Sequence, residues 1–267
     1  MTLDEAAAQL ATISPTPDYD ARLLHEHAAG STNVFAASVE RRLAREPVAY
    51  ITGTRGFWTI DLDVSPAVLI PRADSETLIE AAVAHFGAAG PERVLDLGTG
   101  SGALLLAALD QWPDATGVGI DASDAALDVA RANAMRIAPG RAAMRLGDWA
   151  EGVDETFDLI LANPPYVETG AVLEPQVAAY EPAVALYAGA DGLDAYRSLI
   201  PQLPGVLTSG GIACLEIGST QGDAVAALAT SFGFVAKRVR DLAGHERCLV
   251  FSHADANIML VAAPDSR

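Results

Sequence analysis

The chain has 267 residues, of which 51% are hydrophobic, and this is enough to build a sizeable core. Its 35 acidic residues outnumber the 17 Lys and Arg residues, and the net charge of −18 argues against binding a phosphate backbone. The acidity either serves solubility alone or also suits a basic protein partner. No apolar run is long enough to span a membrane, and the acidic N-terminus lacks the features of a signal peptide. We therefore expect a cytoplasmic monomer that binds neither a membrane nor nucleic acid directly.

Cysteine and histidine are sparse in this sequence. Cys214 and Cys248 both lie in apolar stretches, so we expect free, buried thiols rather than a disulfide or a metal pair. The five histidines show no ligand spacing, and we expect no metal site.

Residues 1–46 have the pattern of a small helical domain. Two helix-breaking stretches, SPTPD and GST, separate three helical segments, and Phe35, Val39 and Leu43 recur at helical spacing. A bundle this short buries little core by itself. It serves either as a packing appendage or as a docking module for a partner.

Residues 47–71 change from helical spacing to alternation. The runs at 50–53 and 57–64 predict a β-hairpin that links two domains. Arg72 follows, and it either is catalytic or substrate-facing or holds the hairpin. A helix is then expected to end near Phe86, with Asp74 or Ser75 as its cap.

Residues 72–253 alternate strands and helices, which predicts an α/β, Rossmann-like domain. Parallel strands are expected at 93–97, 117–120, 142–146, 157–162 and 211–218, a helix at 194–203, and a closing antiparallel hairpin at 234–239 and 247–251. Glu216, inside an apolar strand, either is a paired buried acid or lines a ligand pocket, and we favour pairing. Residues 254–267 form a tail without a clear period.

A glycine-rich turn follows the first of these strands and precedes a helix. Such a turn lets the backbone approach a ligand closely and aims the helix N-terminus at it. Its members are Gly98, Thr99, Gly100, Ser101 and Gly102. Asp121 ends the second strand, where a carboxylate suits ribose hydroxyls. After the third strand, Asp148 can accept the exocyclic amine of adenine and Trp149 can cover its ring.

A stiff proline bend follows the fourth strand, at the sheet edge where open α/β proteins hold ligands. It consists of Asn163, Pro164, Pro165 and Tyr166. The side-chain oxygen of Asn163 and the carbonyl of Pro164 can each accept one N–H of a planar amide or amine, and Tyr166 can pack against its plane. The glycine turn alone also fits a nicotinamide dehydrogenase, but hydride transfer has no use for the proline bend.

The sequence resembles the HemK/PrmC family of protein-(glutamine-N5) methyltransferases. The similar stretches are 47–53 (PVAYITG), 57–58, 68–72 (VLIPR), 94–102 (VLDLGTGSG), 148–149, 163–166 (NPPY), 180–182 (YEP), 191–194, 215–218 (LEIG) and 241–244. The resemblance implies a class I methyltransferase domain that uses S-adenosylmethionine. It further implies methylation of the Gly-Gly-Gln glutamine of class 1 peptide-chain release factors, with these factors as partners.

The resemblance also implies roles for residues of this chain. The turn at 98–102 borders the cofactor, Asp121 holds its ribose, Trp149 lies by the adenine, and the bend at 163–166 holds the substrate amide. Two departures stand out. Ala73 replaces a usual proline. The helical region before Pro47 is shorter by a helix, with the gap near residues 31–35. Because the resemblance implies that this region contacts the release factor, docking is less supported by the resemblance than the chemistry.

Three alternatives remain open. An N6-adenine nucleic-acid methyltransferase uses the same NPPY motif, but the charge and the absence of an evident target-recognition domain argue against it. The nicotinamide dehydrogenase is the second, and a cofactor-binding titration distinguishes it. A non-catalytic protein that binds the cofactor as a sensor or interaction module is the third. The sequence leaves the preferred release factor and the cofactor affinity open.

Overall fold

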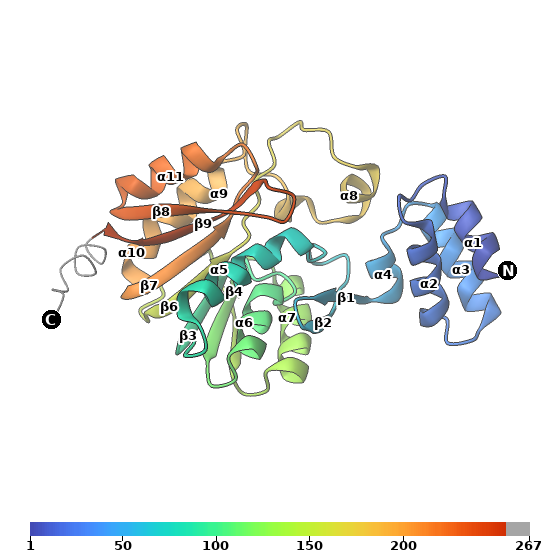
Figure 1. Ribbon diagram of the computed structural model, residues 1–267, viewed down its shortest axis with the longest axis horizontal. Coiled ribbons are helices and arrows are strands. Elements are labelled where there is room, and N and C mark those ends of the chain that lie inside the picture. The colour runs from blue at the N-terminus through green and yellow to red at the C-terminus, as the bar shows by residue number, and fades with distance from the viewer. Residues whose placement is uncertain (255–267) are drawn as a thin grey trace, which may run out of the picture.

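The computed structural model, which describes residues 1–254, is built around a seven-stranded sheet with helices on both faces (Figure 1). Its strands are β3 (Arg93–Leu97), β4 (Thr116–Asp121), β5 (Ala142–Leu146), β6 (Phe157–Ala162), β7 (Leu207–Glu216), β8 (Phe234–Arg240) and β9 (Glu246–His253). Their order is β5-β4-β3-β6-β7-β9-β8, and β9 runs opposite to the rest. The predicted Rossmann-like α/β fold and its closing antiparallel hairpin are confirmed.

Two layers of helices enclose the sheet. One face is covered by α5 (Glu76–Phe86), α6 (Ala103–Gln111) and α7 (Asp124–Ile137), and the other by α9 (Asp194–Leu199), α10 (Leu203–Val206) and α11 (Gly222–Ser231). Because side chains alternate along a strand, Val94 packs with the first layer while Leu95 and Leu97 pack with the second. The carboxyl ends of the parallel strands therefore meet at one edge that neither layer covers.

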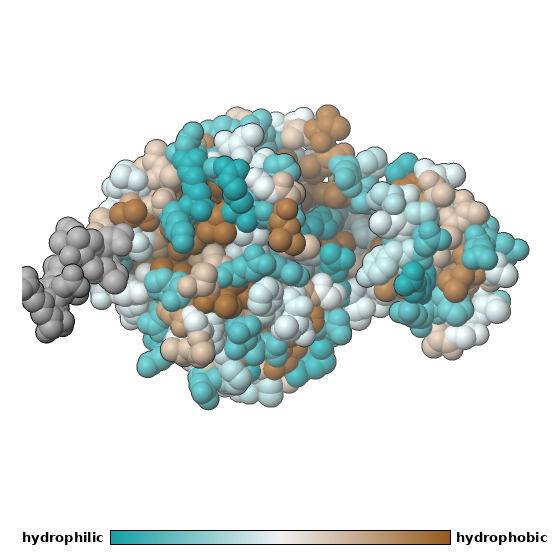
Figure 2. Space-filling model, viewed as in Figure 1, coloured by the Kyte–Doolittle hydropathy of each residue, from teal (hydrophilic) through white to brown (hydrophobic). Residues whose placement is uncertain are grey.

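The N-terminal helices α1 (Leu3–Leu10), α2 (Pro17–His27) and α3 (Thr32–Leu43) lie to one side of the sheet, and the molecule narrows between the two parts (Figures 1 and 2). They share a separate apolar core, and Asp20 pairs with Arg42 inside it at 2.8 Å. Helix α8 (Pro175–Tyr180) reaches this bundle, because the Tyr180 hydroxyl donates to the Ala44 carbonyl at 3.0 Å.

The first strand of the predicted linking hairpin is misplaced. Residues expected to be extended form α4 (Val48–Thr52), and the hairpin consists of β1 (Thr54–Phe57) and β2 (Ile60–Asp63). Pro47 precedes the helix with φ −58°, which suits a helix start, and Gly53 ends it in the left-handed region at φ +75°. Alternation of apolar residues over so short a run does not distinguish a strand from one helical turn.

The helix expected at 194–203 is present but is interrupted by a 3-10 turn and extends to Val206. After α9 the chain forms the 3-10 turn η3 (Ile200–Gln202) and then the short α10, because Pro201 and Pro204 remove backbone donors. Strand β7 begins at Leu207, four residues before the predicted 211, and its register against β6 shifts between Phe157 and Leu159. Two further 3-10 turns, η1 (Ala73–Ser75) and η2 (Ala183–Ala185), lie near the strand ends.

Three remaining expectations concern the chain as a whole. Cys214 and Cys248 are free and buried, as predicted. No helix within residues 1–254 combines the length and apolar character needed to cross a lipid bilayer. Apart from Ala254, the predicted tail at 254–267 lies outside the described residues.

Candidate active site

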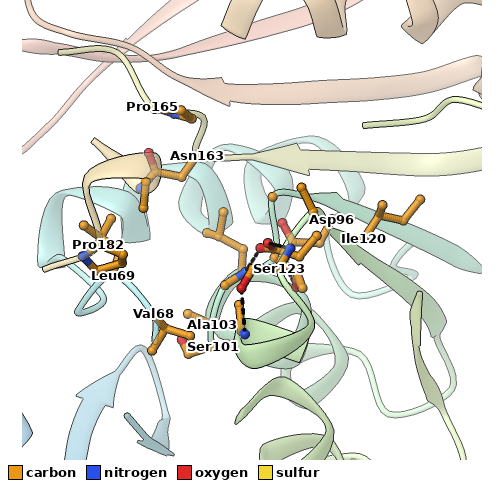
Figure 3. Close-up of a pocket in the computed structure, with 18 of the residues that line it drawn as sticks. Val68, Leu69, Asp96, Ser101, Ala103, Ile120, Ser123, Asn163, Pro165 and Pro182 are labelled. Carbon is orange, nitrogen blue, oxygen red and sulfur yellow. Dashed lines mark hydrogen bonds between the residues drawn. The ribbon is translucent and has the colours of Figure 1, made fainter. Parts of the chain in front are cut away.

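A cavity of about 480 Å³ opens at the carboxyl ends of β3, β4, β5 and β6, a size typical of small-molecule sites (Figure 3). Most of the predicted site residues lie in its wall, namely Gly98, Thr99, Gly100, Ser101, Asp121, Asp148, Trp149, Asn163 and Pro165. Gly102, Pro164 and Tyr166 belong to the same two loops but do not line it. The topology thus gathers side chains and turns that are far apart in the sequence.

The turn after β3 takes its shape from the backbone. Gly98 and Gly100 have φ of +73° and +55°, a region that residues with side chains avoid. The amides of Gly98 and Thr99 both donate to the Ile120 carbonyl, at 2.8 and 2.9 Å. Gly102 has φ +84°, and a Cβ there would press on a side chain of α6. It therefore joins the turn to the helix rather than facing the cavity.

The carboxylate of Asp121 is held in place at the end of β4. One oxygen accepts the Gly100 amide at 2.8 Å, and the other accepts the Ser123 amide at 2.9 Å. Each carboxylate oxygen has a second lone pair, so both can still accept a hydroxyl from a ligand in the cavity. The arrangement combines a fixed orientation with unused acceptor capacity.

Trp149 lies across the glycine turn. Its φ is +52°, an uncommon value for a bulky residue, which is found where the surrounding structure imposes it. A Cβ built on Gly98 would lie 3.4 Å from Cζ3 of the Trp149 ring, so the ring covers the glycine closely. Asp148 is exposed beside it at the rim. A flat apolar ring next to a carboxylate suits a purine with an exocyclic amine.

Asp96 is a site residue that our sequence analysis missed. One carboxylate oxygen accepts bonds from the Thr99 hydroxyl at 2.6 Å and the Leu105 amide at 3.3 Å. The other is buried and has no hydrogen-bond partner within residues 1–254. Burial raises the pKa of Asp96 to about 7, against the lowering effect of the Thr99 bond. The available signal was an acid inside an apolar strand directly before the glycine turn.

Two loops form the walls on the other side of the cavity. Residues 67–71 contribute Val68, Leu69 and Pro71, and the loop at residues 180–192 contributes Pro182 and Val184. Figure 3 shows Leu69 and Pro182 together, across the cavity from Ile120 and Ser123.

An ion pair ties these two walls together. The Arg72 guanidinium pairs with buried Glu181, which also accepts the Ile70 amide at 3.1 Å. Arg72 thus has a structural contact, although that contact is with Glu181 in the loop at residues 180–192 and not with the hairpin. We did not predict the 67–71 wall, although its residues belong to the VLIPR stretch of the family resemblance.

Asn163 projects from the bend after β6 toward the cavity (Figure 3). Its side-chain nitrogen Nδ2 donates to the Ser75 hydroxyl at 3.0 Å. Its oxygen Oδ1 and the Pro164 carbonyl accept no hydrogen bond from residues 1–254. Oδ1 of Asn163 is therefore available to a ligand in the cavity, and the unfilled Pro164 carbonyl lies next to it on a buried residue that does not line the cavity.

Glu216 lies behind this bend at the end of β7 and is 1% exposed. It accepts hydrogen bonds from the hydroxyls of Ser75 and Tyr166, the latter at 3.2 Å, so the predicted pairing is confirmed, with hydroxyl partners. Burial raises the pKa of Glu216 to about 7, opposed by the Ser75 bond and by the nearby Arg247 charge. Ser75 occupies the predicted cap position of α5, but its hydroxyl makes no capping bond there.

Comparisons with known proteins bear on this site. A family model described as "methyltransferase small domain" matches residues 74–179. The release factor glutamine methyltransferase of Rhodospirillum rubrum is 43% identical over 255 residues, which cover 88% of this chain and 78% of the relative. That of Caulobacter vibrioides is 42% identical over 256 residues, covering 88% and 89%. The chain belongs to the release factor glutamine methyltransferase family.

This methyltransferase also shares its fold with a ribosomal protein L11 methylase from Lactobacillus delbrueckii subsp. bulgaricus. The TM-score is 0.53 at 22% identity, and the match covers 71% of this chain and 83% of the other. At this identity the likeness concerns the fold alone. Membership of this methyltransferase family implies the use of S-adenosylmethionine in general.

The cavity fits that cofactor chemically. The buried, unpartnered oxygen of Asp96 suits a cationic group of the ligand. The glycine turn leaves room beside its backbone, since a Cβ at Gly100 would meet open space. Asp121 offers acceptors for hydroxyls and Trp149 offers a ring for adenine.

Proposed function

We propose that this enzyme transfers a methyl group from S-adenosylmethionine to the side-chain amide nitrogen of a glutamine, namely that of the Gly-Gly-Gln motif in class 1 peptide-chain release factors. The observation that carries the proposal is the unfilled acceptor Oδ1 of Asn163 on the wall of the cavity, with the unfilled carbonyl of Pro164 next to it on the same bend. The names of the relatives favour this substrate over the N6-adenine alternative.

In this proposal the cofactor lies along the strand ends. The turn at residues 98–102 borders it, Asp121 accepts its ribose hydroxyls, and Asp148 and Trp149 hold the adenine. Asp96 adds a negative field beside the cationic part. The bound cofactor supplies an electrophilic methyl group on a sulfonium, and this side of the cavity positions it.

Asn163 and Pro164 act on the substrate. A carboxamide nitrogen is a poor nucleophile, because its lone pair is delocalised into the carbonyl. Two acceptors, Oδ1 of Asn163 and the Pro164 carbonyl, would take one N–H each and turn the lone pair toward the methyl group. Orientation of this kind can remove about 7–11 kcal/mol of barrier. The same oxygens stabilise the positive charge that grows on nitrogen.

The charge of the enzyme supports a protein substrate of opposite sign. The net charge is −18, and the face drawn in Figure 2 is mostly hydrophilic with small separate hydrophobic patches. Such a surface speeds the approach of a basic partner and slows that of a nucleic acid.

The test is methyl transfer from labelled S-adenosylmethionine to a purified class 1 release factor. The same factor with its Gly-Gly-Gln glutamine replaced by alanine and a duplex DNA serve as controls. We expect label on the unaltered factor alone. Label on DNA, or no label despite measurable cofactor binding, would contradict the proposed substrate.

A further inference from the structure

We propose that Glu216 is a positioning residue, whose carboxylate acts through the Ser75 hydroxyl to decide which end of the Asn163 amide faces the substrate. The inference deepens the proposed function and rests on it, because it concerns how the glutamine-binding acceptor is set in place. None of these three side chains adjoins another in the sequence, and they come from β7, η1 and the bend after β6.

The direction of the hydrogen bonds follows from the chemistry of each group. An ionised carboxylate only accepts, so the Ser75 hydroxyl must give its single proton to Glu216. The remaining lone pairs of the Ser75 oxygen can then only accept. Asn163 approaches this oxygen at 3.0 Å, and only the NH₂ end of its amide can donate. The oxygen end is thereby left for the cavity.

Tyr166 reinforces the same arrangement. Its hydroxyl donates to the second oxygen of Glu216 at 3.2 Å, so both carboxylate oxygens are engaged by hydroxyl donors. Its carbonyl accepts the Gln221 side-chain amide at 3.0 Å, which holds the bend. Burial raises the pKa of Tyr166 to about 12, the Glu216 charge adding to the effect, so the phenol remains a donor at neutral pH.

The charges around Glu216 place its ionisation near neutral pH. Arg247 on β9 favours the ionised form, whereas Asp74 beside Ser75 disfavours it. Arg247 is shared, since it also pairs with Asp74 at 3.2 Å and with Asp241 at 3.4 Å. Two neutral neighbours complete the surroundings, the thiol of Cys248 on β9 and the hydroxyl of Tyr196 on α9, which donates to the Glu216 backbone carbonyl at 2.8 Å.

If Glu216 loses its charge, the donor and acceptor roles in the hydrogen bonds from Glu216 through Ser75 to Asn163 are no longer fixed. A protonated carboxyl can itself donate to the Ser75 oxygen, and the Ser75 proton can then turn to Asn163. The Asn163 amide would flip and present NH₂ to the cavity, where the substrate NH₂ needs an acceptor. We therefore expect methyl transfer to rise with pH through about 7, where Glu216 loses its proton.

The first test requires no substrate. The side-chain NH₂ resonances of Asn163, identified by their loss in Asn163→Ala, are followed by NMR from pH 5 to pH 9 in ¹⁵N-labelled protein. We expect them to shift with a midpoint near 7, and Glu216→Gln, which preserves size, should abolish that step. A wild-type protein without the step, or a variant that keeps it, would overturn the inference.

The second test measures methyl transfer. Glu216→Gln and Ser75→Ala should lower kcat by about 10–10²-fold, with little change in cofactor affinity or in KM for the release factor. Ser75→Thr, which keeps the hydroxyl, should retain most of the rate. Glu216→Gln should also remove the rise in rate near pH 7.

Tyr196→Phe is the matched control, because it deletes a buried hydrogen bond to the backbone of Glu216 and leaves the carboxylate alone. It should lower the melting temperature and leave the pH profile unchanged. If Tyr196→Phe and Glu216→Gln change the profile alike, the role of Glu216 is only structural and the inference fails. If the wild-type enzyme does not label the release factor, the proposed function fails. The NMR titration still tests whether the charge on Glu216 sets the orientation of the Asn163 amide.

Discussion

The cavity has two sides that are constructed differently, a cofactor side made by the turn at residues 98–102 and Asp121, and a substrate side made by the bend at residues 163–166. On the cofactor side, backbone amides of the glycine turn bond to the Ile120 carbonyl and to Asp121, which lies in the adjacent strand. On the substrate side, side chains from distant segments depend on one another. Asn163 bonds to Ser75, 88 positions away, and Ser75 bonds to Glu216, 141 positions along the chain from it.

This difference has a physical consequence. A turn shaped by glycine φ angles and main-chain bonds keeps its form when neighbouring side chains change. A chain of side-chain hydrogen bonds loses its direction when any one member changes, and buried polar groups are costly when they lose partners. Substitutions on the cofactor side should therefore mainly lower the affinity for S-adenosylmethionine, and substitutions on the substrate side should mainly lower the rate of methyl transfer.

The largest effect is expected at the substrate side. Asn163→Ala removes one of the two acceptors that we propose for the glutamine amide and should lower methyl transfer by about 10²–10³-fold. The affinity for S-adenosylmethionine, measured by calorimetry, should hardly change. Asn33→Ala, which removes the same kind of side chain from the exposed surface of α3, is the matched control. Activity of Asn163→Ala within about threefold of the wild type would refute the role of Asn163.

An intermediate effect is expected at the cofactor side. Asp121→Ala removes a charged acceptor and should weaken the binding of S-adenosylmethionine by about 10–10²-fold. At saturating cofactor much of the rate should return. Asp128→Ala, which removes an exposed carboxylate from α7, controls for the loss of one charge. An unchanged cofactor affinity in calorimetry would count against Asp121.

The smallest effect concerns stability. Because the pKa of Asp96 is raised from 3.8 to about 7 by folding, the wild-type protein should lose stability as pH rises between these values. Asp96→Asn has no such cost, and at pH 8 it should raise the free energy of unfolding by about 1–3 kcal/mol.

The same substitution should weaken cofactor binding, since it removes a negative charge from the cavity. Denaturant unfolding at pH 4 and pH 8 measures the stability difference, with surface Asp114→Asn as the control. A stability gain of Asp96→Asn that is the same at both pH values would contradict a raised pKa for Asp96.

The predictions from sequence succeeded where one strand and its following turn carry the information. The strands at 93–97, 142–146 and 157–162 match those of the structure residue for residue, because they are short, apolar and bounded by turns. The error at α4 arose where a few apolar residues stand between a proline and a glycine. The walls at 67–71 and at Pro182 depend on the pairing of Arg72 with Glu181, a contact that no local pattern reveals.

The sequence by itself determined the order of strands and turns, and with it the glycine turn, Asp121 and the NPPY bend at one edge of the sheet. This follows because parallel strands joined by helices must bring their carboxyl ends together. Only the tertiary structure decided the orientation of Asn163, the burial of Asp96 and the partners of Glu216. Hydrogen-bond direction and desolvation depend on which distant groups pack around a side chain, and packing of that kind is a property of the folded chain.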